Sequence, residues 1–199
     1  MKNFSNKFLK ETSKIANMLD DNILENMAQE LSNLRNRNGR LFFIGSGGGA
    51  GHSSHAVCDF RKLANIECYS PSDNVSELTA RINDDGWDTA YSNWLKVSNF
   101  NSDDSLFVFS VGGGSNEKNI SVNLVNCVSL ANKLGSSVLG IVGRDGGYTK
   151  QSSELVMVIP TIDESLTTPH TEGWQAVLWH LLISHPKVAV NETKWESTK

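Results

Sequence analysis

The first forty residues alternate apolar and polar positions with the period of a helix. Phe4 and Phe8 lie four residues apart, as do Ile15 and Leu19. After the turn at residues 20–21, a second apolar stripe consists of Ile23, Met27, Leu31 and Leu34. The polar residues 36–39 end this stripe. The pattern predicts two amphipathic helices within residues 1–38, ahead of the rest of the chain.

Beyond residue 40 the pattern changes to short, continuous apolar runs. They span residues 41–44, 66–69, 106–109, 138–142 and 155–159, and the run at 66–69 is the weakest. Such runs are typical of strands buried on both faces, as in a parallel sheet. Helical segments separate them, at about residues 53–63, 88–97, 116–134 and 170–184. This alternation predicts an α/β fold with a ligand crevice at the carboxyl ends of the strands.

Composition excludes several classes of protein. The chain has 199 residues, 39% hydrophobic and 20% charged, which indicates one globular domain over residues 1–199 with residues 1–38 as a helical preface. A net charge of −4 disfavours nucleic acid as a partner. No apolar run approaches the roughly 18 residues of a membrane helix, and the N-terminus lacks a signal-peptide pattern. Three scattered cysteines without a CxxC pair favour a cytoplasmic location.

A glycine-rich loop follows the first predicted strand directly. Residues 45–51 read Gly-Ser-Gly-Gly-Gly-Ala-Gly and lead into a helix, whose N-terminal N–H groups attract anions. His52 stands where the P-loop pattern requires lysine, which disfavours a nucleoside triphosphatase. Gly45-x-Gly47-x-x-Ala50 loosely matches the dinucleotide fingerprint, so a nicotinamide-dependent oxidoreductase is one hypothesis. A tight turn without a ligand is another.

A second loop of the same kind favours a phosphorylated ligand. Residues 110–116, Ser-Val-Gly-Gly-Gly-Ser-Asn, follow the strand at 106–109 and precede another helix. Two such loops predict one small phosphorylated molecule held between two helix N-termini. The turn at residues 143–147 either lines the same crevice or is a plain turn. The candidate substrate-binding residues of the two loops are Ser46, Gly47, Gly48, Ser110, Gly112 and Ser115.

Two histidines and two carboxylates form a candidate metal site. His55 and Asp59 share one helix face, and Glu172 and His180 lie in the last predicted helix. This ligand set is typical of zinc. Eight helical residues rise about 12 Å, so a straight helix cannot offer both Glu172 and His180 to one ion. A bend at Gly173, or a site shared between subunits, would be required. The alternatives are a surface ion pair on the first helix and a core histidine on the last.

The order of these motifs resembles the sedoheptulose-7-phosphate isomerase (phosphoheptose isomerase) family of sugar isomerase (SIS) domain proteins. The resemblance rests on the two loops, His55-x-x-x-Asp59, the segment Leu-Thr-Ala-Arg-Ile-Asn-Asp at 78–84, the segment 140–147 and the final helix with His180. It implies a flavodoxin-like (SIS) three-layer α/β sandwich with a five-stranded parallel sheet. It also implies a homotetramer with active sites at subunit contacts, and one zinc ion per chain.

The resemblance further implies aldose–ketose isomerisation of sedoheptulose 7-phosphate to a heptose 7-phosphate, for bacterial surface-carbohydrate synthesis. It implies His55, Asp59, Glu172 and His180 as zinc ligands, with Asp59 and His180 as the acid–base pair and Asp84 and Glu172 near the substrate. Asp59 stands where the family has glutamate, and Glu172 where it has glutamine. Gly49 replaces a serine, and the second loop lacks a family hydroxyl. A non-catalytic phosphosugar-binding SIS protein, or an isomerase of another sugar phosphate, are therefore alternatives.

Overall fold

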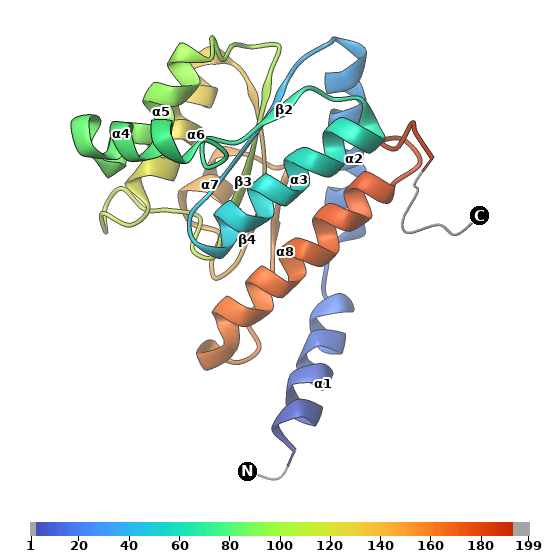
Figure 1. Cartoon of the computed structure of the whole chain (residues 1–199). Coiled ribbons are helices and arrows are strands. Elements are labelled where there is room, and N and C mark those ends of the chain that lie inside the picture. Colours follow the sequence, from blue (N-terminus) through green and yellow to red (C-terminus); the bar gives the residue numbers. More distant parts are fainter. Residues whose placement is uncertain (1–2, 193–199) are drawn as a thin grey trace.

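The computed structural model describes residues 3–192, which are built around one five-stranded sheet (Figure 1). All pairings are parallel, in the order β2-β1-β3-β4-β5. The strands are β1 (Leu41–Gly45), β2 (Cys68–Tyr69), β3 (Ser105–Ser110), β4 (Ser137–Val142) and β5 (Val156–Val158). This is the strand order of flavodoxin-like proteins, so the predicted α/β architecture is confirmed.

Helices cover both faces of the sheet and make a three-layer sandwich (Figure 1). They are α1 (Phe4–Ala16), α2 (Asp21–Asn36), α3 (Gly48–Ala64), α4 (Val75–Asp85), α5 (Trp87–Val97), α6 (Val122–Leu134), α7 (Gly147–Ser152) and α8 (Thr167–Ser184), with a 3-10 turn at Glu164–Leu166. Among residues 3–192, none of these helices is both long and apolar enough to cross a membrane.

The two apolar layers follow from alternation along the buried strands. In β1, Phe43 belongs to a core cluster shared with α2, α3 and α8, whereas Phe42 and Ile44 belong to the cluster shared with α5 and α6. Neighbouring side chains of a strand point to opposite faces. Because both faces are covered, every residue of β1 is buried, which explains the continuous apolar run.

The starts of two helices differ from the sequence-based expectation, and helix α4 was missed. Helix α3 starts at Gly48 rather than near residue 53, because glycines with poor helix propensity form its first turn. Helix α6 starts at Val122 rather than near 116, and a bridge between Ser115 and Ile120 closes the segment before it. Helix α4 was not predicted, since none of its residues is fully buried and its pattern is weak.

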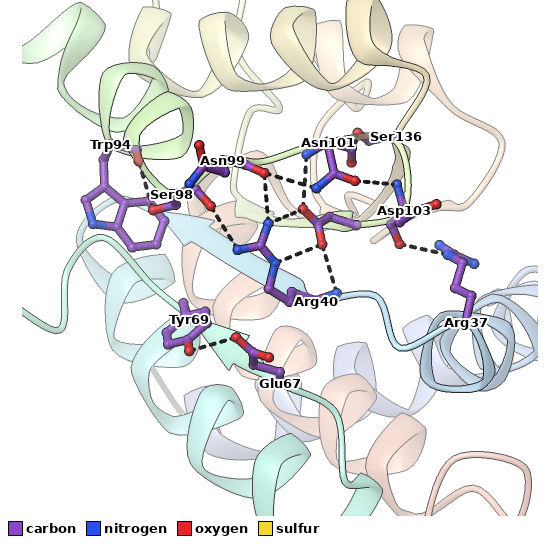
Figure 2. Close-up of polar contacts among 11 residues, drawn as sticks. Arg37, Arg40, Glu67, Tyr69, Trp94, Ser98, Asn99, Asn101, Asp103 and Ser136 are labelled. Carbon is purple, nitrogen blue, oxygen red and sulfur yellow. Dashed lines mark hydrogen bonds and ion pairs between the residues drawn. The ribbon is translucent and has the colours of Figure 1, made fainter.

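A partly buried ion pair, Arg40 with Asp104, ties the amino ends of β1 and β3 to the end of α5 (Figure 2). The Arg40 Nε donates to Asp104 Oδ1 at 3.1 Å and its Nη2 donates to Oδ2 at 2.7 Å. The other guanidinium N–H groups donate to the carbonyls of Ser98 and Asn99. The backbone N–H groups of Arg40 and Asn101 also donate to Asp104, whose side chain is only 3% exposed.

Removing one partner of this pair should destabilise the fold strongly. Arg40→Met leaves the Asp104 charge buried without its main partner, and we expect a loss of about 3–5 kcal/mol in unfolding free energy. Lys187→Met, which removes a solvent-exposed ion pair with Glu25, is the control and should cost at most about 1 kcal/mol. Urea unfolding of both variants measures the difference. Equal, small losses would show that the Arg40 network does not hold the strands together.

Candidate functional site

The carboxyl ends of β1, β3 and β4 open into a cleft of about 1330 Å³. Four of the predicted substrate-binding residues line it: Ser46, Ser110, Gly112 and Ser115. The third turn lines the same cleft through Arg144, Asp145 and Gly147, so it is more than a plain turn. The structure thus brings the second and third loops to one crevice, as the strand order requires.

The backbone of the second loop packs closely against the backbone of the third loop. The Ser110 hydroxyl accepts a hydrogen bond from the Gly113 N–H at 3.0 Å, which closes the turn. Gly113 has a φ of 68°, and a Cβ there would lie 1.9 Å from the Gly146 carbonyl oxygen. Thr149 N–H and Tyr148 N–H donate to the carbonyls of Gly113 and Gly114. Only glycine fits position 113, so these glycines shape the cleft wall.

Ser121 is a cleft residue that the sequence analysis missed. It lines the cleft as the N-cap of α6, and its side chain makes no capping hydrogen bond. The first N–H groups of α6 therefore lack a side-chain acceptor, which makes this helix end suited to an anion. The missed signal was the serine directly before the apolar period of Val122–Leu134.

Two cationic side chains line the same part of the cleft. Arg144 and Lys118 both border it, and the Arg144 side chain passes Gly112, 3.9 Å from where a Cβ would stand. No ion pair found among residues 3–192 involves either of them. With the uncapped end of α6, they offer positive charge to an anion, although the carboxylates of Glu117, Asp145 and Glu164 border the same cleft.

The first glycine loop is arranged differently. Gly47 caps α3 with a φ of 58° and offers no side chain. Over Gly48 stands the carboxylate of Glu172, whose atoms would lie 2.6–2.7 Å from a Cβ at that position. A negative charge thus already occupies the N-terminus of α3, where the helix dipole favours it. Gly47 and Gly48 do not line the cleft, whereas Ser46, which lies between β1 and Gly47, does.

The predicted histidine–carboxylate set is brought together in part. Ligand atoms of His55, Asp59 and His180 all lie within 4.8 Å of one another. They come from α3 and α8, which lie side by side on one face of the sheet (Figure 1). His55 Nε2 is 3.8 Å from Asp59 Oδ2, and the rings of His55 and His180 are 5.5 Å apart. Asp59 is buried, whereas the His55 side chain is 58% exposed.

Two details fit this trio to a metal ion. His180 Nδ1 lies 2.7 Å from the Ala176 carbonyl, which can only accept, so Nδ1 carries the proton and Nε2 keeps a free lone pair. Asp59 Oδ2 is buried and has no hydrogen-bond partner among the described residues. Three ligands from nitrogen and carboxylate with one open position are typical of catalytic zinc.

Glu172 and Asp84 lie apart from the trio. Glu172 precedes His180 by eight residues on α8, which runs unbroken from Thr167 to Ser184 and does not bend at Gly173. The two side chains are therefore about 12 Å apart along the helix axis. Asp84 is exposed near the end of α4, where Asn83 Nδ2 donates to it at 2.8 Å, and it does not line the cleft. Neither residue joins His55 within one chain.

His52 lies between the cleft and the trio. Its ring is half-buried, with its centroid 5.9 Å from that of Phe109, a cleft residue. Burial lowers the pKa of His52, although the charge and the backbone carbonyl of Glu172 oppose this shift. The neutral form is therefore favoured. His52 thus places an uncharged ring next to the Glu172 carboxylate.

The chain is similar to known proteins in sequence and in fold. It is 30% identical over 165 residues to the lincomycin biosynthesis protein LmbN of Streptomyces lincolnensis, covering 78% of this chain but only 58% of that relative. It is 27% identical over 149 residues to a phosphoheptose isomerase of Helicobacter pylori, covering 72% of both chains. No protein-family model matches the sequence.

The fold is shared with solved phosphoheptose isomerases. The phosphoheptose isomerase GmhA from Neisseria gonorrhoeae superposes with a TM-score of 0.72, covering 90% of this chain and 95% of that one. Only 19% of residues are identical, so the likeness concerns the fold.

Proposed function

We propose that this chain is a phosphoheptose isomerase of the SIS type, which isomerises sedoheptulose 7-phosphate to a heptose 7-phosphate, because it is similar to such enzymes in sequence and in fold. The observation that carries the proposal is the trio His55, Asp59 and His180, whose ligand atoms come together from α3 and α8. A cleft with an uncapped helix end and two cationic side chains lies at the carboxyl ends of the strands. Isomerisation of a phosphosugar needs acid–base or metal groups for the sugar carbonyl and positive charge for the phosphate. We further propose a bacterial surface-carbohydrate pathway and a cytoplasmic location, which the free thiols of Cys58, Cys68 and Cys127 support.

The charges of the cleft set the direction of the substrate. The end of α3 already has the Glu172 carboxylate beside it, whereas the end of α6 has no side-chain cap and borders the cleft that Arg144 and Lys118 also line. We therefore place the phosphate group at Ser110, Ser115 and Ser121, and the sugar carbonyl toward α3 and α8. This orientation brings the reacting carbons, rather than the phosphate, toward the trio.

The trio supplies the acid–base groups that isomerisation needs. Ketose-to-aldose conversion moves one proton from C1 to C2 and another from the C1 hydroxyl to the C2 oxygen. His180 Nε2 has a free lone pair, which can take the carbon-bound proton from C1 and return it to C2. Asp59 Oδ2 has no other partner and can carry the hydroxyl proton. A zinc ion bound here would polarise the substrate carbonyl. The same lone pairs of His180 Nε2 and Asp59 Oδ2 would then bind the metal, so these two groups can move protons only while they are released from the ion.

We propose that His55, Asp59 and His180 hold this zinc ion, one per chain. Glu172 could add a fourth ligand only from a second copy of the chain, because its own α8 places it two turns away. With one carboxylate, the site keeps a net positive charge and an open position. That combination favours a substrate oxygen, which gains negative charge during the reaction.

Exposed apolar side chains support a homotetramer. Val177 and Leu181 lie one turn apart on α8 and are 51% and 41% exposed, and Phe4 and Leu9 on α1 are 54% and 66% exposed. Leu178, Trp179 and Leu182 bury the opposite side of α8, so the second half of this helix carries apolar side chains on its exposed side as well as on its buried side. Such helices are usually buried on all sides, which indicates that a second copy covers α8.

We predict conversion of sedoheptulose 7-phosphate by the purified protein, seen as a new anomeric proton signal by NMR. Asp59→Asn and His180→Gln should each lower kcat by roughly 10²–10⁴, the usual effect of losing a general acid or base. His185→Gln, in a histidine that pairs with Glu25 away from the trio, is the control and should keep full activity. Binding without turnover would instead favour a non-catalytic phosphosugar-binding protein.

The metal proposal predicts about one zinc per chain in protein purified without chelator, measured by elemental analysis. His55→Ala and His180→Ala should lose most of it, because each removes one of three ligands. His185→Ala should keep it. Glu172→Ala should also keep it, since that carboxylate lies over Gly48. Loss of zinc from Glu172→Ala would show that a second copy completes the site, and unchanged zinc in every variant would refute the trio.

The assembly proposal predicts a mass near 87 kDa by light scattering, four times the 21.8 kDa chain. Leu181→Glu should yield smaller species, because burying an unpaired charge in the contact is unfavourable. Val97→Glu, at a 69% exposed position on α5, is the matched control and should leave the mass unchanged. A wild-type monomer at micromolar concentration would contradict the proposal.

A further inference from the structure

Asn123 is a buried amide next to the cleft residues Ser121 and Leu124. It lies in the first turn of α6, is fully buried, and does not line the cleft. Its Nδ2 donates to the Ser46 hydroxyl oxygen at 3.3 Å. Ser46 is half-buried and lines the cleft at the carboxyl end of β1. The amide of α6 therefore reaches across to the loop that leads into α3.

We propose that Asn123 is a positioning residue, which sets the direction of the Ser46 hydroxyl so that Ser46 donates a hydrogen bond to an oxygen of the sugar phosphate. A hydroxyl has one proton and two lone pairs. Because the Asn123 N–H occupies a lone pair of Ser46, the Ser46 proton must point elsewhere. The cleft side is the open side. The inference rests on the proposed phosphosugar function.

The surroundings of Asn123 support a role through Ser46. The bond to Ser46 is the one side-chain hydrogen bond that Asn123 makes among residues 3–192, and its Oδ1 is buried without a partner there. A buried, half-satisfied amide lowers stability, and an apolar side chain would avoid that loss. The amide therefore contributes little to the stability of the fold. Its one side-chain hydrogen bond among residues 3–192 is the N–H that it donates to Ser46.

The backbone of Ser46 is fixed as well. Its carbonyl accepts a hydrogen bond from the Gly49 N–H at 3.1 Å in the first turn of α3. With the backbone held by α3 and the hydroxyl held by α6, Ser46 lies between the two helix ends that border the site. Because both the backbone and the hydroxyl of Ser46 are already held, the residue loses little further conformational entropy when substrate binds, which favours affinity.

The test is a double-mutant cycle with sedoheptulose 7-phosphate as substrate. Ser46→Ala should raise KM about tenfold with kcat changed less than about threefold, and Asn123→Ala should raise KM about three- to tenfold. The double variant should be no worse than Ser46→Ala alone, because Asn123 acts through that hydroxyl. Effects that multiply in the double variant would overturn the proposal. Asn126→Ala, on the same helix but bonded to the Asp88 carbonyl, should leave KM unchanged.

Asn123→Asp tests the direction of the bond and guards against a variant that fails to fold. Aspartate has nearly the same shape but only accepts, so it would draw the Ser46 proton away from the cleft. Asn123→Asp should raise KM by a factor at least about three times larger when Ser46 is present than in the Ser46→Ala background. In that background only the negative charge of the new aspartate can act on the substrate. Equal effects in the two backgrounds would overturn the proposal.

Failure of the proposed function is distinguishable from failure of this inference. If the wild-type protein does not turn over sedoheptulose 7-phosphate, the isomerase proposal fails. The same variants are then compared by calorimetric dissociation constants for sedoheptulose 7-phosphate and for inorganic phosphate, which need no turnover. For the sugar phosphate, the dissociation constant of the double variant should be no higher than that of Ser46→Ala alone. If the effects of the two single substitutions multiply in the double variant, the inference is overturned in this assay too.

Discussion

Parallel pairing of β1, β3 and β4 is the constraint on which the site depends. Gly45 pairs with Phe109, and Ser110 pairs with Val142, so the three strands end within one residue of each other. Parallel strands release all their loops at the same edge, and each helix that follows starts there. The N-termini of α3 and α6 consequently face one edge of the sheet. A register shift in β3 would separate Ser46 from Asn123 and divide the cleft.

Although the two helix ends share an edge, they differ in charge. The end of α3 is already matched by Glu172, and the end of α6 has Arg144 and Lys118 as neighbours. Two glycine loops alone would bind an anion at either end. The Glu172 carboxylate on α8 makes the two helix ends different, because the end of α3 already has a negative charge beside it and the end of α6 has no side-chain cap.

Much of this could be predicted from the sequence, because buried strands and helix faces leave local patterns. The runs at 41–44 and 106–109 became β1 and β3, and the spacing of His55 and Asp59 placed both on one face of α3. Ser121 was missed because the segment before it extends the loop without changing composition. The contact of Glu172 with Gly48 depends on how α8 lies against α3, which no local pattern encodes.

The packing of α8 also limits what one chain can do. Gln175 Nε2 donates to the Ile141 carbonyl at 2.9 Å, and Trp179 is fully buried, so α8 is fixed against β4 and α3. In this position of α8, Glu172 lies beside Gly48 and His180 lies beside His55. The difference in residue number is 124 for the first pair and 125 for the second, so the two helices advance together. The two helices run in parallel register, so no side-chain rotation brings Glu172 to the trio. Among residues 3–192, no further histidine, cysteine or carboxylate joins the trio, so a fourth group would come from solvent, substrate or a second copy.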